Sequence, residues 1–237
     1  MCGVPCRLPF RCIARLRCVG YMCSEEWEAT YLKFIRIVVN PKKFSKILRQ
    51  WDLEPRAKIL DLCCGTGGTI EVFRKAGYHQ VYGLDISMNL LCRVKKGIPV
   101  LCADANACPI KNESFDVVVI HKALHHFLDH HRLLAEIKRI LKPDGIFCFI
   151  EPRKTWFRKL YHVALLSPFA ELFPPLVRMR HAALIEEGKT YFKWLDNTDE
   201  FFDLLEHKFS FTTESRQDDF MHHIVKCRSQ KQSDSRI

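Results

Sequence analysis

A glycine-rich turn between two apolar segments, in residues 57–73 ("AKILDLCCGTGGTIEVF"), is the feature that most constrains the fold. The first apolar run ends around Asp61. Three glycines follow at positions 65, 67 and 68, and apolar residues then resume at helical spacing. A strand, a glycine turn and a helix in this order are typical of a ligand loop at the carboxyl edge of a parallel sheet. Because glycine has no Cβ, the backbone of such a loop can approach a ligand closely.

The segments around this turn predict a parallel sheet covered by helices. Five short runs are apolar throughout and do not alternate, as in strands buried on both faces. They start at Lys58 ("KILDL"), Val81 ("VYGLDI"), Val100 ("VLCAD"), Asp116 ("DVVVI") and Ile146 ("IFCFI"). Amphipathic segments separate them, most clearly residues 129–141, which the sequence Lys-Pro-Asp-Gly should end. The alternation predicts an α/β fold with helices on both faces of the sheet.

The chain divides into one domain with two short flanking segments. We expect residues 1–22 to be a disordered or non-native extension, residues 23–228 to be the domain, and residues 229–237 to be a disordered tail. Within the domain, residues 154–206 predict a helical insertion rich in aromatic residues. Two strand-like runs follow from Lys208 and Phe220, close enough for a hairpin.

Charge and cysteine usage argue against several classes of protein. The net charge is +10, but residues 1–22 contribute four arginines and no acid, so the body of the chain is only moderately basic. The twelve cysteines include no C-x-x-C pair, so we expect no metal site. Scattered cysteines in apolar runs favour a reducing, cytoplasmic location. Mitochondrial targeting by the arginine-rich N-terminus is a minor alternative, since that segment lacks serines and Pro5 and Pro9 would break a helix.

The spacing of a second acidic residue points to a nucleoside ligand. Asp85 ends the second predicted strand, 20 residues after Gly65, where a carboxylate can accept hydrogen bonds from ribose hydroxyls. A nicotinamide dinucleotide fingerprint would place its third glycine at residue 70, which is isoleucine. Taken alone, the loop leaves a tight turn without a ligand as an equal alternative.

Several motifs together resemble one family. "LDLCCGTGG", "GLDIS", "CADA", "FDVVVIHKALHHF" and "EIKRILKPDGIFCFIEP" occur in that order between residues 57 and 152. The combination resembles the class I S-adenosylmethionine-dependent methyltransferases, and most closely the type 11 methyltransferase domain. The resemblance implies a mostly parallel, seven-stranded Rossmann-like sheet with an antiparallel last strand. It also implies S-adenosylmethionine as the cofactor.

The resemblance assigns roles to individual residues. Asp61 should anchor the loop and face the amino-acid end of the cofactor, Asp85 should hold the ribose, and Asp104 with the backbone of Ala105 should meet the adenine. The full set expected at the cofactor is Asp61, Cys63, Gly65, Thr66, Gly67, Asp85, Ile86, Asp104, Ala105 and His121. The chain departs from the family at Cys63-Cys64, where a small residue or glycine is common.

Candidate proton acceptors follow the fourth and fifth predicted strands. His121 and His126 are the candidate catalytic residues, with His125 and Glu151 as further possible bases. A histidine pair at the start of a helix more often serves packing or capping, so a base among them is an open hypothesis. His222-His223 lies in the last strand, where successive side chains face opposite ways, so at most one could face the site.

The acceptor is predicted from the aromatic insertion. We expect residues 154–206 to form a lid that suits a small or apolar acceptor, lipid-like or quinone-like; the alternative is that its aromatic residues simply pack the added helices. An RNA or protein acceptor is less favoured, because no Asn-Pro-Pro-Tyr-like or Pro-Cys motif follows the fourth strand. A catalytically inactive binding subunit and a nicotinamide oxidoreductase remain as other classes. The sequence predicts no oligomeric state.

Overall fold

The computed structural model describes residues 39–167 and 188–230, together with residue 32. The predicted extension over residues 1–22 lies outside the described residues. Residues 23–38 of the predicted domain, apart from residue 32, residues 168–187 of the predicted lid, and residues 231–237 also lie outside the described residues.

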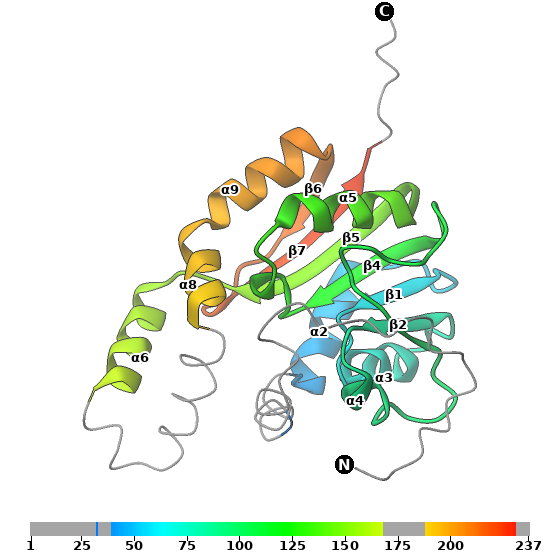
Figure 1. Ribbon diagram of the computed structural model, residues 1–237, viewed down its shortest axis with the longest axis horizontal. Helices are drawn as coiled ribbons and strands as arrows, with labels where there is room; N and C mark the ends of the chain where they lie inside the picture. Colours follow the sequence, from blue (N-terminus) through cyan, green and yellow to red (C-terminus); the bar gives the residue numbers. More distant parts are fainter. Residues whose placement is uncertain (1–31, 33–38, 168–187, 231–237) are drawn as a thin grey trace, which may run out of the picture.

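Seven strands form one sheet, in the order β3-β2-β1-β4-β5-β7-β6 (Figure 1). Neighbours from β3 to β5 run parallel, and β7 is antiparallel to both β5 and β6, as predicted. The strands are β1 (Ile59–Leu62), β2 (Val81–Asp85), β3 (Val100–Cys102), β4 (Phe115–His121), β5 (Leu141–Pro152), β6 (Phe211–Arg216) and β7 (His222–Ser229). The sheet therefore has six parallel strands and one antiparallel strand.

Two ends of the predicted elements differ from the observed ones. Strand β5 begins at Leu141 and not at Ile146, because the chain enters the sheet directly after the helix that ends at Ile140. Leu141 pairs with Phe115 and Ile146 with Val117, with a register shift between the two pairs. Asp144, between them, adopts a left-handed conformation (φ 60°). At the other end, β7 includes Ser229, and the Gln230 N–H donates to the Ser210 carbonyl (2.9 Å). Ordered backbone therefore extends two residues past the predicted boundary at 228.

Helices cover both faces of the sheet. In Figure 1, α2 (Pro41–Trp51), α3 (Gly68–Lys75) and α4 (Met88–Leu91) lie below the sheet, with α5 (His130–Ile140) and α9 (Thr198–Asp203) above it. Alternate residues of β4 face the two layers: Val117 and Val119 pack with α2 and α3, while Val118 and Ile120 pack with α5. The sheet is thus buried on both sides, which explains its uniformly apolar strands.

Helix α2 begins at an Asn-Pro pair that suits a helix start. Asn40 is the N-cap, with its Oδ1 accepting from the Lys43 N–H (3.1 Å), and Pro41 occupies the first helical position, where no N–H is needed. The buried face of this helix consists of Phe44, Ile47, Leu48 and Trp51. This packing places the N-terminal end of α2 beside the last residue of β4, since the Phe44 and His121 rings stack at 5.2 Å.

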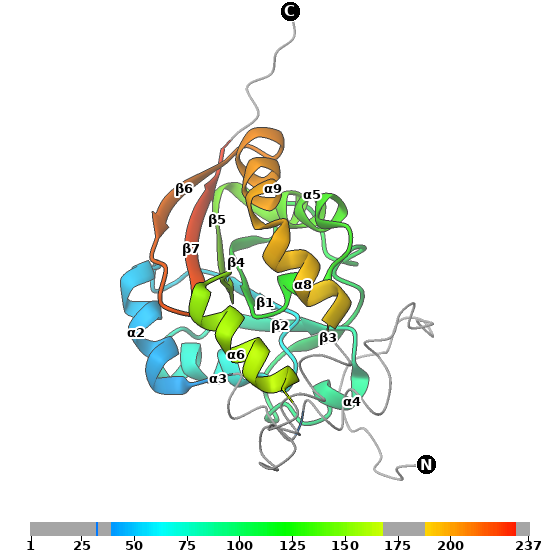
Figure 2. The same cartoon turned by 90° about the vertical axis from the view of Figure 1, so that its left-hand side faces the viewer.

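The aromatic insertion has two parts with different roles. In the second part, α8 (Gly188–Asp196) and α9 place Tyr191, Trp194 and Phe201 in the core that α5 shares. For these residues the alternative of simple packing is therefore correct. In the first part, α6 (Trp156–Leu166) lies beyond the carboxyl ends of the parallel strands (Figures 1 and 2) and keeps Trp156 69% exposed.

One buried arginine ties α6 to the rest of the molecule. The Arg158 Nε donates to the Arg153 carbonyl (2.8 Å), and its two terminal nitrogens donate to the Tyr191 hydroxyl and the Met221 carbonyl. The guanidinium therefore joins α6, α8 and the turn between β6 and β7, and gives the insertion a fixed attachment.

We predict that Gly83→Ala destabilises the fold by about 1–3 kcal/mol, the usual cost of overpacking a core. A Cβ at Gly83 in β2 would lie 2.7 Å from Cys64 Sγ and 2.8 Å from Ile70 Cδ1, both buried. Urea unfolding followed by circular dichroism measures the loss. In the comparison variant Gly97→Ala the new Cβ meets no atom within 4 Å. Only the positive φ of Gly97 is penalised there, at about 1 kcal/mol. Equal losses in the two variants would contradict the steric argument.

Candidate active site

The residues predicted to bind a cofactor come together at the carboxyl edge of the parallel strands. Asp61 precedes the last residue of β1, Asp85 ends β2, Asp104 follows β3 and His121 ends β4. These strands are neighbours in the order β3-β2-β1-β4 and run parallel, so their ends share one edge. In open α/β sheets this edge is where ligands bind.

The Asp85 carboxylate is built into the glycine loop. Its Oδ2 accepts from the Gly65 N–H (2.7 Å) and its Oδ1 from the Ser87 N–H (2.9 Å). Asp85 is buried, so these charge-assisted bonds fix both the loop and the carboxylate. The 20-residue spacing between Gly65 and Asp85 therefore reflects a direct contact in this structure.

The loop needs left-handed backbone at three positions. Gly65 (φ 53°) and Gly67 (φ 79°) adopt it, and so does Cys63 (φ 64°). A residue with a Cβ pays about 1–2 kcal/mol for this conformation. This requirement explains why glycine suits position 63, where the chain departs from the family. Burial raises the pKa of the Cys63 and Cys64 thiols well above its usual range, which disfavours the reactive thiolate.

Asp61 is the one buried carboxylate of the loop with an unsatisfied oxygen among the described residues. It is 1% exposed, and its Oδ2 has no hydrogen-bond partner in that part of the chain. Burial, and secondarily repulsion from Asp85, raise the pKa of this carboxyl well above its usual range. A buried group of this kind would be stabilised in its ionised form by a cation. The site therefore fits a ligand with a positively charged group near Asp61.

The remaining predicted cofactor residues lie around the same edge. The Asp104 Oδ1 accepts from the N–H of Asn106, two residues further along the chain (2.8 Å), and Ala105 is buried. The Ile86 carbonyl accepts from the Cys102 thiol (3.5 Å). Thr66 lines a shallow pocket between the start of α2 and α3.

His121 is neutral and held between α2 and α3. Its ring stacks on Phe44, and its Nδ1 lies 3.2 Å from the Thr69 hydroxyl. Burial, with the nearby positive charge of Lys122, lowers the pKa of this imidazole well below its usual range. The ring can therefore pack against a positively charged ligand without adding a charge of its own.

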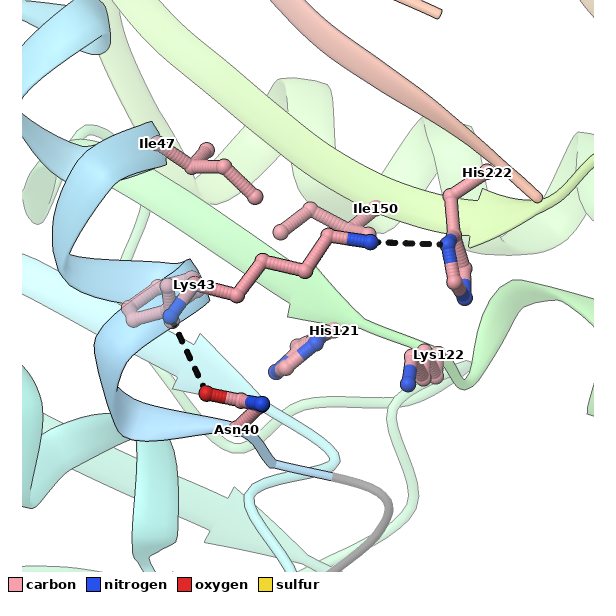
Figure 3. Close-up of a pocket in the computed structure, with 8 residues that line it drawn as sticks. Asn40, Lys43, Ile47, His121, Lys122, Ile150 and His222 are labelled. Atoms are coloured by element: carbon pink, nitrogen blue, oxygen red, sulfur yellow. Dashed lines mark hydrogen bonds between the residues drawn. The ribbon is translucent and has the colours of Figure 1, made fainter. Parts of the chain in front are cut away.

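Beside His121 the structure contains a small pocket that the sequence did not predict. Figure 3 shows Lys43 extending from α2 toward His222 of β7. His121 and Lys122 also line this pocket. Ile47, Phe44 and Ile150 supply an apolar wall, and Asn40 completes the lining. The sequence pattern did not indicate either lysine of this pocket. Lys43 lies about 80 residues before His121 in the chain, and Lys122 adopts a left-handed conformation (φ 58°) that is rare for lysine.

The two adjacent histidines of the last strand diverge as the strand geometry predicts. His222 faces the pocket, with its Nδ1 3.3 Å from Lys43 Nζ. His223 faces the opposite side, where its Nδ1 lies 2.9 Å from Asp218 Oδ1. In the described ranges, no group of three His, Cys, Asp or Glu side chains could hold a metal ion.

Glu151 and His125 form a buried pair that supports the loop after β4. Glu151 is 0% exposed; its Oε1 accepts from the Ala123 N–H (2.5 Å) and the Leu124 N–H (2.6 Å), and its Oε2 lies 2.7 Å from His125 Nδ1. His126 follows in the short 3-10 helix η2 (Leu124–His126), with its ring centroid 4.2 Å from that of His125. Of the two candidate catalytic histidines, the pocket is lined by His121 and not by His126.

Comparisons with known proteins agree with this arrangement. The family model of a methyltransferase domain matches residues 60–149. The demethylmenaquinone methyltransferase of Lactococcus lactis is 35% identical over 154 residues, which cover 61% of this chain and 59% of that protein. That of Bacillus mycoides is 32% identical over 142 residues, covering 53% and 60%. The chain thus spans about three fifths of the length of these curated relatives.

Solved structures show the same fold. A SAM-dependent methyltransferase from Aquifex aeolicus aligns with a TM-score of 0.58 at 16% identity, covering 85% of this chain and 98% of the other. One from Methanosarcina mazei aligns with a TM-score of 0.57 at 19% identity, covering 78% and 97%. The family model of a methyltransferase domain thus matches residues 60–149, which contain the glycine loop described above, and the solved structures share the fold of this chain.

Proposed function

We propose that this protein is an S-adenosylmethionine-dependent methyltransferase whose acceptor is a small, quinone-like molecule. The observation that carries the proposal is the buried, unsatisfied Asp61 oxygen beside a left-handed glycine loop that Asp85 holds in place. S-adenosylmethionine has the groups that this edge would bind: an ammonium for Asp61, ribose hydroxyls for Asp85 and an adenine for Asp104 and Ala105. Cys63, Gly65, Thr66, Gly67 and Ile86 would line its remaining surface.

The residues of the chain would act mainly by binding and orientation. When bound, the cofactor supplies a methyl group already activated on a sulfonium. Holding the two reactants in line accounts for about 7–11 kcal/mol of barrier lowering in favourable cases. His121 is neutral, so it would add no repulsion beside the sulfonium. His121 is also the better placed of the two candidate bases, because it lines the pocket next to the cofactor edge and His126 does not.

A quinone-like acceptor is supported by two observations. The relatives over this region are named demethylmenaquinone methyltransferases. In addition, α6 exposes apolar side chains beyond the carboxyl edge, where an acceptor would enter: Trp156, Phe157, Leu160 and Val163, with Phe220 packed against the first two. Exposed apolar patches of this kind commonly mark sites for apolar ligands. In this proposal α6 forms the lid, while α8 and α9 are its packed base.

We expect Asp61→Asn to stabilise the unliganded protein and to weaken cofactor binding. The pKa of Asp61 is raised in the folded state, so this carboxyl favours folding only while protonated, and wild-type stability falls as the pH rises from about 4. The amide is neutral at every pH, so at pH 8 the variant should be more stable by about 0.5–2 kcal/mol, and the difference should vanish near pH 4. Because the variant lacks one charged partner, its affinity for S-adenosylmethionine should be lower by about tenfold or more. Urea unfolding at both pH values and calorimetry measure these changes. A variant that is less stable at pH 8 would contradict the argument.

Location in the cytoplasm is part of the proposal. Its support is that Cys64, Cys108, Cys148 and Cys227 are buried free thiols, as expected in a reducing compartment. No helix in the described part of the chain is long and apolar enough to cross a membrane.

The proposal is tested by two measurements on the full chain. Calorimetry with S-adenosylhomocysteine and with NADH separates a methyltransferase from a nicotinamide oxidoreductase, and heat with NADH alone would overturn the assignment. Transfer of a labelled methyl group from the cofactor into a cell extract, separated into lipid, small-molecule, protein and RNA fractions, then identifies the acceptor class. We expect label in the lipid or small-molecule fraction. Label only in RNA or protein would overturn the acceptor, and cofactor binding without any transfer would favour an inactive binding subunit.

A further inference from the structure

Helix α6 turns an apolar stripe outward, which is the reverse of an ordinary surface helix. Trp156, Leu160 and Val163 follow one another at helical spacing and are 69%, 57% and 64% exposed. The opposite face contains Arg158 and His162, which are both buried. A surface helix of a globular protein normally packs its apolar stripe on the core and keeps its charged face in water. The stripe of α6 therefore suits a surface other than the core of the described residues.

The inner face of α6 is held firmly, so the outer face is presented in one orientation. Arg158 donates to the Tyr191 hydroxyl and to two backbone carbonyls, as described above. One turn further along, the His162 ring contacts the rings of Tyr191 and Phe192, with centroid distances of 5.6 and 5.2 Å. Both buried side chains thus attach α6 to α8.

A phenylalanine from the turn before β7 extends the outer face. The Phe220 ring is 52% exposed, and its centroid lies 4.8 Å from that of Phe157 and 6.1 Å from that of Trp156. Figure 1 shows α6 at the periphery of the molecule, beyond the carboxyl ends of the parallel strands, and Figure 2 shows it from the outside. We call five exposed side chains the α6 patch: Trp156, Phe157, Leu160, Val163 and Phe220.

The sequence around the α6 patch is positively charged. Residues 152–170 contain four basic side chains and no acidic one, and Lys159 is exposed on α6 beside the stripe. Two of the four form ion pairs with acids of neighbouring elements: Arg153 with Asp218 (3.3 Å) and Lys154 with Asp196 (2.6 Å). The segment therefore keeps an excess of positive charge next to its apolar stripe, and it complements an anionic surface.

The size and composition of the α6 patch favour a lipid surface over a protein partner. A stable protein–protein interface uses about 20–30 residues a side, many more than the five of this patch. Helices that lie in a membrane interface combine Trp, Phe and Leu on one face with Lys or Arg, and they bind anionic lipids. Trp is also enriched at the level of the lipid headgroups.

We propose that the α6 patch docks this protein on an anionic lipid bilayer. Trp156, Leu160 and Val163 enter the boundary between headgroups and acyl chains, and Lys159 contacts the anionic headgroups. Helix α6 has 11 residues, about half of what spans a bilayer, so it lies on the surface. The docking goes beyond the proposed function and does not depend on methyl transfer. It would turn the carboxyl edge of the sheet toward the lipid, from which an apolar acceptor would come.

The test is sedimentation of the full chain with vesicles of phosphatidylcholine, with and without phosphatidylglycerol. We expect wild-type protein to bind the anionic vesicles more tightly than the neutral ones. Leu160→Ser should weaken binding to the anionic vesicles by about 10-fold or more, which corresponds to one buried leucine side chain. Lys159→Gln should weaken it by about 5-fold on anionic vesicles and leave binding to neutral ones unchanged.

Leu128→Ser is the matched control, since Leu128 is 67% exposed in the loop after η2 and does not belong to the α6 patch. It should bind vesicles as wild-type protein does. No sedimentation of wild-type protein would overturn the proposal, and so would an equal loss in Leu128→Ser and Leu160→Ser. A dimer of wild-type protein in gel filtration that Leu160→Ser abolishes would assign the patch to a second copy of the chain instead.

Tryptophan fluorescence separates insertion from adsorption by charge alone. The difference between the spectra of wild-type protein and Trp156→Phe isolates the emission of Trp156, which is exposed. Its emission should shift to shorter wavelengths on the anionic vesicles, because the ring leaves water. An unshifted emission in sedimented protein would overturn the proposal. Emission at short wavelengths before vesicles are added would show that the chain itself covers the patch, and would also overturn it.

Calorimetry with S-adenosylhomocysteine separates this proposal from the proposed function. The variants Leu160→Ser and Lys159→Gln should bind it as wild-type protein does, because the α6 patch is not part of the cofactor edge. If wild-type protein binds S-adenosylhomocysteine and no vesicles, the docking fails and the methyltransferase assignment stands. If it binds vesicles through the α6 patch and no S-adenosylhomocysteine, the docking stands and the proposed function fails.

Discussion

Asp85→Ala is expected to reduce the affinity for S-adenosylmethionine by about 10²–10⁴-fold. The carboxylate accepts from the Gly65 and Ser87 N–H groups, and in the proposed complex it also accepts from two ribose hydroxyls. A hydrogen bond to a charged group contributes about 1.5–3 kcal/mol, so the loss of two such bonds corresponds to this range. The loop would also lose the group that fixes its backbone, which adds to the effect. Calorimetry with the cofactor and with S-adenosylhomocysteine measures it.

The control is Asp199→Ala, which removes an exposed carboxylate in the first turn of α9. Its affinity for the cofactor should equal that of wild-type protein. Circular dichroism of Asp85→Ala must show an intact fold, so that the loss can be assigned to binding. An Asp85→Ala protein that is folded and binds the cofactor as wild-type protein does would remove Asp85 from the site and, with it, the ribose assignment.

The sheet and its ligand edge could be predicted because they depend on local patterns. Uniformly apolar runs gave the buried strands, and the prediction that Asp85 ends the second strand agrees with the structure, where it is the last residue of β2. The helix ending at Ile140 was equally visible from its spacing. By contrast, the early start of β5 at Leu141 depends on a register shift against β4, which no local pattern encodes.

The pocket beside His121 could not be predicted, for a different physical reason. Its lining comes from α2, the end of β4, β5 and β7, so only tertiary packing brings Lys43, Lys122 and His222 together. A lysine in a left-handed conformation has no sequence signature, unlike a glycine. The sequence did predict that only one of His222 and His223 could face the site, because strand geometry alone decides this.

The aromatic insertion shows how composition can mislead about function. The ten aromatic residues between 154 and 206 suggested a lid, but Tyr191 and Trp194 are core residues whose rings pack under η2 and α5. Among the described residues of the insertion, the exposed aromatic side chains are Trp156 and Phe157 of α6 and Phe192 of α8. Aromatic residues are used for both purposes, and exposure in the folded protein is what separates them.

Glu151→Ala is expected to destabilise the protein by about 3–5 kcal/mol, the usual cost of breaking a buried charged pair. Removing this carboxylate leaves the Ala123 and Leu124 N–H groups and the His125 ring without their acceptor in a fully buried place. Because these residues directly follow His121 and Lys122, the same change should loosen the pocket. Urea unfolding measures the stability, and calorimetry with S-adenosylhomocysteine measures binding at the neighbouring cofactor edge.

Glu151→Gln separates support of the loop from acid–base chemistry. The amide oxygen can still accept from the two N–H groups, so we expect this variant to lose only about 1–2 kcal/mol and to keep its affinity for S-adenosylhomocysteine. Methyl transfer should then fall little, because Glu151 acts by positioning the loop and both of its oxygens are already bound. Glu54→Ala, which removes an exposed carboxylate before β1, should change neither stability nor that affinity. A Glu151→Gln protein that is stable and binds the cofactor normally, and yet has lost methyl transfer, would instead identify Glu151 as the base, a role that its buried bonds to Ala123, Leu124 and His125 argue against.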